Sequence, residues 1–499
     1  MDTPLHAIDL TALNLDAPTR ELLQRLLNHI ETQAAELQAL RAENQALRDE
    51  NARLKGQKGK PHFKANQPLQ PAPRPAAAPT AETPAPAEPK VPRSERITID
   101  RDKIVPLERS QVPPDFETNG YRDVIIQNLR FERDTVRYRL ERGFSAATGQ
   151  FFEASLPEAL QGQSFGPDLQ AFVQMLYFEL RVPEEKILTR LQALNLVISA
   201  GEISNILIKK HLSQFADERK AVLRAGLQTT DFQHIDDTGL RVAGVNHYFS
   251  TLCNPYFSCF FIRRQKNRNT VADLLKLKRL DAQPQPESEP PATPAPSAKL
   301  EDLPGLRDAV RILVADDAPQ FDQQTEILAL CWIHEERHYA KLRPYFDAHR
   351  KLVDDFRSEI WAYYRRLKAY AAAPTEAEKQ ALDTAFDDLF GRTTGYADLD
   401  HRIALTRAKK AHLLVVLDFP HVPLDNNPAE RAGRELVVKR KISYGPRNAD
   451  GAEAWEVFLS LLDTCRKNGV DFYAYLRDRI AKANLIPPLE TLVRAHAPP

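Results

Sequence analysis

Residues 424–441 read LDNNPAERAGRELVVKRK, a stretch that predicts a helix start with one acid among many cations. An Asn side chain can cap free backbone N–H groups, and proline in the first turn gives up a donor that the helix does not use. Asn427 and Pro428 therefore predict the start, with Asn427 as the cap and Glu430 in the third helical position. Helical spacing places the following residues on the face of Glu430: Arg434, Val437 and Lys441. The side that packs inward is small and apolar: Ala429, Ala432, Gly433 and Leu436.

Glu430 has a plain structural interpretation from local rules. It can be a capping-box acid, or it can pair with Arg434 four residues later, a pair worth about 0.2–0.5 kcal/mol. The surrounding sequence resembles the C-terminal signature of IS66-type insertion-sequence transposases in DNNPAER at residues 425–431, the later RK, Asn468-Gly469 and FYAYL from Phe472. The resemblance implies that Glu430 completes a metal-binding acid triad.

Composition sets the outer bounds. A chain of 499 residues exceeds what one hydrophobic core usually serves, so we expect several domains. The 68 basic residues balance 68 acidic ones, so a nucleic-acid site has to rest on local clusters. Four cysteines without C-x-x-C spacing argue against a disulfide scaffold and against an ordinary zinc module. The start lacks the apolar run of a signal peptide, and no stretch approaches the roughly 20 apolar residues that cross a bilayer. The sequence therefore predicts a cytoplasmic protein without a membrane partner, and the transposase resemblance implies that it is nucleoid-associated.

Residues 1–55 predict a coiled-coil dimerisation helix. Apolar and amide residues recur at alternating intervals of three and four from Leu23 to Leu54. Asn44 and Asn51 lie in this seam, where each amide needs its twin across a two-stranded interface. We therefore expect a homodimer or a higher oligomer. The alternative is a single amphipathic helix that packs on the chain's own body.

The next two regions differ in composition. Residues 56–95 are rich in Pro and Ala and nearly free of large apolar side chains, which predicts a disordered linker. Residues 96–160 predict a β-rich module, with strands at 124–129 and 135–140 and a turn at Thr148-Gly149. In the family resembled, this region carries paired cysteines that hold zinc. Those cysteines are missing here, so we expect a zinc-finger-like module without the metal.

Residues 161–226 predict a helical, DNA-binding region. Apolar periodicity marks helices at 169–178 and 184–196, and another helix from Ile203 follows the turn-like Ser199-Ala200-Gly201. Two helices around a short glycine-containing turn suit a DNA-reading pair. Ordinary helical bundles share this spacing, and the sequence leaves both readings open.

Paired acids occur in two apolar strand patterns. Asp236 and Asp237 lie within FQHIDDTGLRV at residues 232–242, and Asp316 and Asp317 directly follow RILVA. Further strand signals at 247–252 and 256–262 predict an antiparallel meander, and an apolar run at 327–333 leads into HEER.

Carboxylates in buried strands indicate a cation, because a buried acid is costly unless it is paired or bound to metal. Mg²⁺ prefers carboxylates and water, and two ions about 3.5–4 Å apart serve phosphoryl transfer. We expect two Mg²⁺ ions, with Mn²⁺ as a substitute. The structural alternative is that these acids cap the turns that follow.

Two further motifs resemble the family. HIDDTG resembles its D-E-T segment, with Asp237 in place of the glutamate, and CWIHEER from Cys331 resembles its C-W-x-H-x-R-R segment. On that alignment the catalytic and metal-binding triad is Asp236, Asp316 and Glu430. Strand alternation by itself leaves Asp236 or Asp237, and Asp316 or Asp317, as the ligand.

The expected fold is a multidomain α/β protein. The resemblance implies a ribonuclease-H-like catalytic domain at residues 227–447, interrupted by a disordered Pro-rich loop at 282–298 and a helical insertion at 338–412. Residues 448–499 predict a C-terminal helical tail that packs on the catalytic domain as a lid. The coiled coil, the β-rich module and the helical region precede it.

Basic side chains flank the expected acidic centre and suit a DNA groove, although a charge run is usually a solvated face. The candidate DNA-binding residues are His334, Arg337, Arg431, Arg434, Lys439, Arg440, Lys441, Arg263 and Arg264.

The predicted function is that of a DDE transposase, which cuts DNA at insertion-sequence ends and transfers the strand to target DNA. Its partners would be both DNAs and accessory proteins of the same element. The alternatives are a catalytically inactive dimeric DNA-binding regulator or accessory protein, and a plain nuclease of the same fold.

Overall fold

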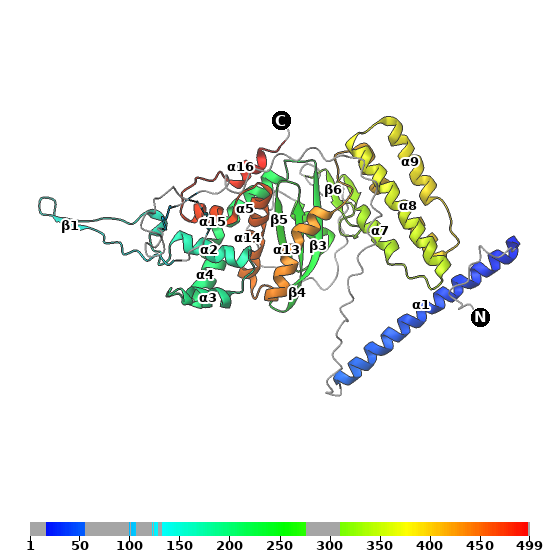
Figure 1. Cartoon of the computed structure of the whole chain (residues 1–499), viewed down its shortest axis with the longest axis horizontal. Helices are drawn as coiled ribbons and strands as arrows, with labels where there is room; N and C mark the ends of the chain where they lie inside the picture. The colour runs from blue at the N-terminus through cyan, green and yellow to red at the C-terminus, as the bar shows by residue number, and fades with distance from the viewer. Residues whose placement is uncertain are drawn as a thin grey trace, which may run out of the picture. The chain divides into compact units, whose positions relative to one another are not determined.

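The computed structural model describes residues 16–54, 99, 101–105, 122, 124–127, 132–275 and 310–497 (Figure 1). The expected linker at 56–95 and the expected loop at 282–298 lie outside the described residues. The chain divides into two compact units, one of residues 1–39 with 135–499 and one of residues 40–134. The described part of the second unit is the later half of one helix and short segments between residues 99 and 134 that are neither helix nor strand.

A mixed sheet of five strands lies at the centre of the first unit, in the order β5-β4-β3-β6-β7. The strands are β3 (Phe232–Val242), β4 (Val245–Cys253), β5 (Ser258–Arg263), β6 (Ile312–Ala315) and β7 (Ile327–Leu330). The first three pair antiparallel, which confirms the predicted meander, and β6 and β7 run parallel to β3. The β3–β4 hairpin turns at Ala243 and Gly244, both with positive φ, as a two-residue turn requires.

The outer edge of β5 is covered by α14 (Ala449–Lys467). Strand N–H groups donate to helix side chains: Ile262 to Glu456 Oε1 at 2.6 Å, Phe260 to Ser460 Oγ at 2.9 Å, and Ser258 to Thr464 Oγ1 at 3.2 Å. Four residues of a helix rise about 6 Å, and two residues of a strand rise about 6.6 Å. Every fourth residue of α14 therefore stays level with every second residue of β5. This C-terminal helix therefore completes the sheet and is not a separate lid.

The main hydrophobic core joins the sheet to helices from both ends of the first unit. These helices are α2 (Pro167–Phe178), α3 (Glu184–Ala193), α4 (Ala200–Ile208), α5 (Leu212–Gly226), α15 (Phe472–Ile480) and α16 (Leu489–Arg494). The helices expected at residues 161–226 are thus present. Phe458 of α14 stacks with Phe178 at 4.6 Å and contacts Phe215 at 5.1 Å between ring centroids. Helical region, sheet and C-terminal helices fold around one core.

The β-rich module is smaller than expected. It contains one hairpin, β1 (Arg142–Ser145) and β2 (Gln150–Glu153), which closes at the predicted Thr148-Gly149 turn and precedes a short 3-10 helix, η5 (Glu158–Leu160). The strand predicted at 135–140 is wrong, and the described part of the one at 124–129 is not a strand either. A segment with an alternating pattern forms a strand only if a second strand lies beside it to share hydrogen bonds. The Thr148-Gly149 turn brings together only the residues next to it, so the earlier segments have no partner strand in this hairpin.

A second hydrophobic core belongs to the helical insertion. Its helices are α7 (Trp332–Ala340), α8 (Asp347–Ala372), α9 (Glu376–Phe390), α10 (Ala397–Arg407), α11 (Lys410–Leu413) and α12 (Val415–Asp418). Helices α8 and α9 lie side by side (Figure 1). Trp332 packs on Tyr363 at 5.5 Å between ring centroids. The apolar run at 327–333 was expected to be one strand. The strand ends at Leu330 instead, because Trp332 already starts α7.

Three helices remain. A short helix, α6 (Arg268–Leu275), follows β5, and α13 (Asn427–Ser443) lies across β3 and β4 (Figure 1). The predicted inward side of α13 is confirmed, since its small apolar residues are buried. The N-terminal heptad region forms α1 (Ala17–Leu54). Among the described residues, no helix combines the length and apolarity needed to span a bilayer.

Candidate active site

Asp236 lies within β3 just beyond the segment that pairs with β6, and Asp316 directly follows β6. The last paired residues of β3 and β6 are His234 and Val314. Asp236 lies two residues after His234, and Asp316 lies two residues after Val314. Neighbouring strands are about 4.8 Å apart, so the two carboxylates are close. Burial, reinforced by the negative charges of Asp316 and Glu430, raises the pKa of Asp236 to about 7. Asp236 is thus a largely buried acid close to two other carboxylates.

Helix α13 brings Glu430 to the face of the sheet that carries Asp236. Asp236 is the cross-strand partner of Thr251, and a Cβ at Gly433 of α13 would lie 3.1 Å from Thr251 Oγ1. Cross-strand partners point to the same face, so Asp236 points toward α13. Gly433 allows the helix to approach this closely.

Asp237 points to the other face, because successive strand residues alternate. Its cross-strand partner is Ser250, and it accepts a hydrogen bond from Gln320 Nε2 at 3.4 Å. Burial raises the Asp237 pKa, and the hydrogen bonds from Ser250 and Gln320 offset part of that increase.

Glu430 is held by Arg337 of α7, and His334 of the same helix lies beside it. Both terminal nitrogens of Arg337 donate to the carboxylate, at 3.1 Å and 3.2 Å. His334 Nε2 lies 3.4 Å from Glu430 Oε1 and also accepts from Arg337 at 3.2 Å. The predicted site residues His334 and Arg337 thus lie beside the third acid of the expected triad.

Asn426 fixes the start of α13 against β3, a role that the sequence did not suggest. Its Nδ2 donates to the Ile235 carbonyl at 2.7 Å, its Oδ1 lies 3.0 Å from His234 Nδ1, and its backbone N–H donates to Cys331 Sγ at 3.2 Å. The helix begins at Asn427 with Asn426 as N-cap, so the predicted capping by Asn427 is wrong. Two consecutive Asn residues before Pro428 were the only hint, since one helix start needs one cap.

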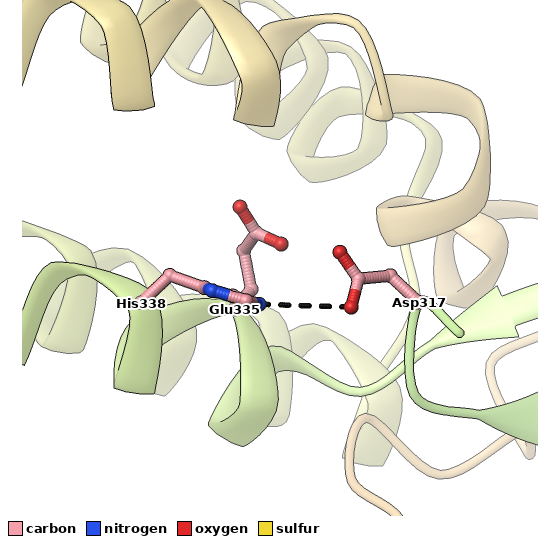
Figure 2. A group of neighbouring side chains, drawn as sticks. All are labelled: Asp317, Glu335 and His338. Carbon is pink, nitrogen blue, oxygen red and sulfur yellow. Dashed lines mark ion pairs between the residues drawn. The ribbon is translucent and has the colours of Figure 1, made fainter. Parts of the chain in front are cut away.

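A different cluster has the spacing of a metal site. Asp317, Glu335 and His338 offer ligand atoms within 4.8 Å of one another, the one such group among the residues with a described position (Figure 2). Asp236, Asp316 and Glu430 are therefore not gathered that tightly. Figure 2 shows Asp317 facing His338, 3.6 Å away.

Cations already neutralise the Asp317 cluster. Lys409 donates to Asp317 and lies 3.3 Å from Glu335 Oε2, and Arg402 pairs with the other oxygen of Glu335. Burial favours a higher Asp317 pKa, but the Lys409 ammonium holds it below its usual range. A paired, hydrogen-bonded carboxylate needs no metal. These bonds instead fasten α10 to α7, and Lys409, at the start of α11, to the end of β6.

Apart from His334, described above beside Glu430, the predicted DNA-binding residues divide into three groups. Several side chains are exposed: Arg264, Arg337, Arg431, Arg434 and Lys441. Others are partly covered by bonds within the chain. Arg263 pairs with Glu456 at 2.7 Å, and Arg440 donates to the Gly239 carbonyl.

Lys439 corrects the predicted set, because it is buried with only 1% of its surface exposed. Its Nζ donates to the Tyr177 carbonyl at 2.6 Å and lies 3.4 Å from the centroid of the Tyr177 ring. Burial lowers the Lys439 pKa to about 7. Helical spacing from Ala432 and Leu436 could have placed it on the inward side.

Comparison with known families matches residues 306–454 to the family described as Transposase IS66 family. The match confirms the resemblance to IS66 transposases. The matched IS66 segment contains Asp316, His334, Arg337 and Glu430, and it begins after Asp236. The assignment of Asp236 therefore depends on the strand pairing and on the direction of its side chain.

Similar proteins occur in Sinorhizobium fredii (strain NBRC 101917 / NGR234), and each is named only as uncharacterized. Protein y4jO is 38% identical over 187 residues, which are 37% of this chain and 58% of that protein. Protein y4jD is 25% identical over 179 residues, and y4qI is 24% identical over 174 residues. The matches cover 35% of y4jD and 31% of y4qI, and 33% and 32% of this chain. The chain thus spans between about a third and three fifths of the relatives it matches.

Proposed function

We propose that the chain is a DDE transposase that cuts DNA at insertion-sequence ends and joins the freed 3′ hydroxyl to target DNA. The observation that carries the proposal is the mutual position of Asp236, Asp316 and Glu430. Asp236 and Asp316 lie just past the parallel pairing of β3 with β6, and Glu430 comes from a helix on the same face. Burial raises the pKa of Asp236, and the charges of Asp316 and Glu430 add to that increase. The match of residues 306–454 to IS66 transposases supports it.

The strand order supports a ribonuclease-H-like catalytic domain. A meander of three antiparallel strands is followed by two strands parallel to the first, in the order β5-β4-β3-β6-β7. The resemblance implies this fold, which brings the first acid from the central strand, the second from its parallel neighbour and the third from a later helix. The helical insertion enters between the second and third acids.

The acid set fits Mg²⁺ or Mn²⁺ better than the Asp317 cluster does. Hard divalent ions prefer carboxylate oxygens and water, and Asp236 is a buried acid beside the charges of Asp316 and Glu430, which add to the effect of burial on its pKa. Asp236, Asp316 and Glu430 would hold the ions, which when bound neutralise charge on the attacking and leaving oxygens of an in-line displacement. When ions bind, Glu430 would give up part of its bonding to Arg337, and Arg337 and His334 would remain beside it.

The chain's own side chains would bind and orient the DNA. Arg431, Arg434 and Lys441 are exposed on α13, the helix that carries Glu430, and Arg264 is exposed just after β5. Arginine and lysine at such positions neutralise phosphates and set the register of the backbone. Target and element ends, a homodimer through α1, and accessory proteins of the element are the proposed partners.

The test is a joining assay with the full chain, Mg²⁺, the DNA segments that flank its gene and the co-encoded proteins of the element. We predict that Asp236→Asn, Asp316→Asn and Glu430→Gln each abolish joined product while DNA binding persists. Asp237→Asn is the matched control and should keep the product, because Asp237 points to the other face. Joined product from Asp236→Asn would refute the assignment of that acid.

A catalytically inactive DNA-binding regulator is the second candidate. The observation that favours it is the bidentate bond from Arg337 to Glu430, which gives the acid a structural partner. Under that reading the wild-type protein binds the flanking DNA and yields neither cleaved nor joined product. Cleavage without joining would instead indicate a plain nuclease.

A further inference from the structure

The first part of α1 packs on the helical insertion through a face separate from its heptad seam. Leu27 and Glu31 are buried, at 8% and 6% exposure. The seam residues one position earlier remain exposed, Leu26 at 49% and Ile30 at 39%. Consecutive helical residues differ by about 100° in direction, so the two faces are distinct.

Glu31 acts as a cap for a helix in the insertion. Helix α8 begins after Phe346, which has no side chain able to accept from the first free N–H groups. Glu31 accepts from the backbone N–H groups of Tyr345 at 2.7 Å and Phe346 at 3.0 Å, and lies 3.1 Å from His349 Nδ1. Its buried carboxylate is therefore fully partnered, at the end of α8 where the helix dipole favours an anion.

Asn28, one turn before Glu31, acts in the same way on α10. That helix begins after Tyr396, again without a side-chain cap of its own. Asn28 Oδ1 accepts from the Ala397 N–H at 3.2 Å, and its Nδ2 donates to the Gly395 carbonyl at 3.0 Å. The Gln24 side chain covers Gly395, where a Cβ would lie 1.7 Å from its Nε2. The His349 and Tyr396 rings stack at 4.5 Å between these two helix starts.

We propose that residues 24–31 of α1 form a clamp that caps α8 and α10 of the same chain's insertion, while the heptad seam stays free for a second copy. Both helix starts lack caps of their own, and both caps come from one face of α1. The insertion is in turn fastened beside the acidic site through the ion pair of Lys409 with Asp317, the residue after Asp316. The helix that is expected to pair two copies thus also sets the position of the insertion in each copy. The clamp does not depend on the proposed transposase activity.

Hydrogen exchange of the full-length protein tests the clamp, read at the amides of residues 345, 346 and 397. Glu31→Ala should speed exchange at Tyr345 and Phe346 by roughly five- to tenfold, and Asn28→Ala should do so at Ala397, because each removes a different cap. The matched control is Glu36→Ala, an exposed acid of the same helix, which should leave all three amides unchanged. The separate local effects distinguish loss of a cap from unfolding of the insertion.

A seam variant tests whether the clamp comes from the same chain. Leu40→Asp should lower the mass measured by light scattering from dimer to monomer and leave exchange at Tyr345 and Phe346 slow. Unchanged exchange in Glu31→Ala would overturn the clamp. Fast exchange at those amides in the Leu40→Asp monomer would overturn its assignment to the same chain.

Discussion

At the scale of single residues, adjacent positions in this chain have opposite surroundings. Asp236 and Asp237 are equal candidates by composition, and the strand period alone cannot separate them, because it says that they differ in face and not which face is which. The position of α13 decides, since Gly433 contacts the side of β3 and β4 that carries Asp236. That contact joins segments nearly 200 residues apart and leaves no local trace in the sequence.

The burial of Lys439 also depends on contacts with distant segments, and it leads to a prediction. Its folded pKa of about 7 lies below the ordinary value of 10.5, so between these pH values the unfolded chain binds a proton that the folded chain does not. The free energy of unfolding should therefore rise with pH in this window, by about 2 kcal/mol between pH 7 and pH 9. Cation–π contacts with Tyr177 and Trp455 oppose part of this effect.

Lys439→Met keeps the volume and removes the charge, so it should abolish that rise in denaturant unfolding measured at pH 7 and pH 9. Lys441→Met, on the exposed side of the same helix, serves as control and should keep it. Equal pH dependence in wild type and Lys439→Met would show that the buried amine does not control stability.

At the scale of elements, helices were predicted more reliably than strands. The helical patterns predicted at 169–178 and 184–196 have apolar periodicity, and the meander has long β-branched and aromatic runs. The strand predicted at 135–140 also alternates, but Val136 and Tyr138 remain exposed without a sheet to pack on. A strand depends on its neighbour, so pattern alone is a weaker guide there.

The pairing of α14 with β5 was not predictable from pattern, because Glu456, Ser460 and Thr464 look like isolated polar positions in an apolar helix. Together they satisfy the edge of the sheet, which would otherwise be open to another strand. Glu456 also pairs with the buried Arg219, at 3.6 Å.

Glu456→Ala should lower the free energy of unfolding by about 3–5 kcal/mol, because it leaves the Arg219 charge and a strand N–H buried without their partner. Chemical denaturation measures the change. Glu453→Ala removes an exposed acid one turn earlier on the same helix and should change stability by less than about 0.5 kcal/mol. A loss below about 1 kcal/mol for Glu456→Ala would contradict the role given to this edge contact.

At the scale of the whole molecule, the regions expected along the chain are only partly separate units in the folded structure. The helices at 161–226 and the C-terminal helices share one hydrophobic core with the sheet, and the insertion has its own core. Changes in composition predict the order of regions, of which the helical insertion lies among the described residues. The sequence could not predict which regions pack together, since that depends on contacts between distant segments.

For the N-terminal helix, the structure bears on only one of the two interpretations of its sequence, and the coiled-coil dimer stays a prediction. Part of α1 packs on the chain's own body through Leu27 and Glu31, and the heptad leucines on the neighbouring face stay exposed. A heptad pattern reports apolar spacing and says nothing about polar residues such as Glu31 and Asn28, which make the contacts with the insertion.

Equilibrium binding of Mn²⁺ to the full-length protein, measured by titration calorimetry, tests the central claim most directly. The account predicts that the wild type binds Mn²⁺, that Asp236→Asn, Asp316→Asn and Glu430→Gln each lose that binding, and that Asp317→Asn keeps it. Loss of binding in Asp317→Asn together with unchanged binding in Asp236→Asn would move the metal to the Asp317 cluster and contradict the account.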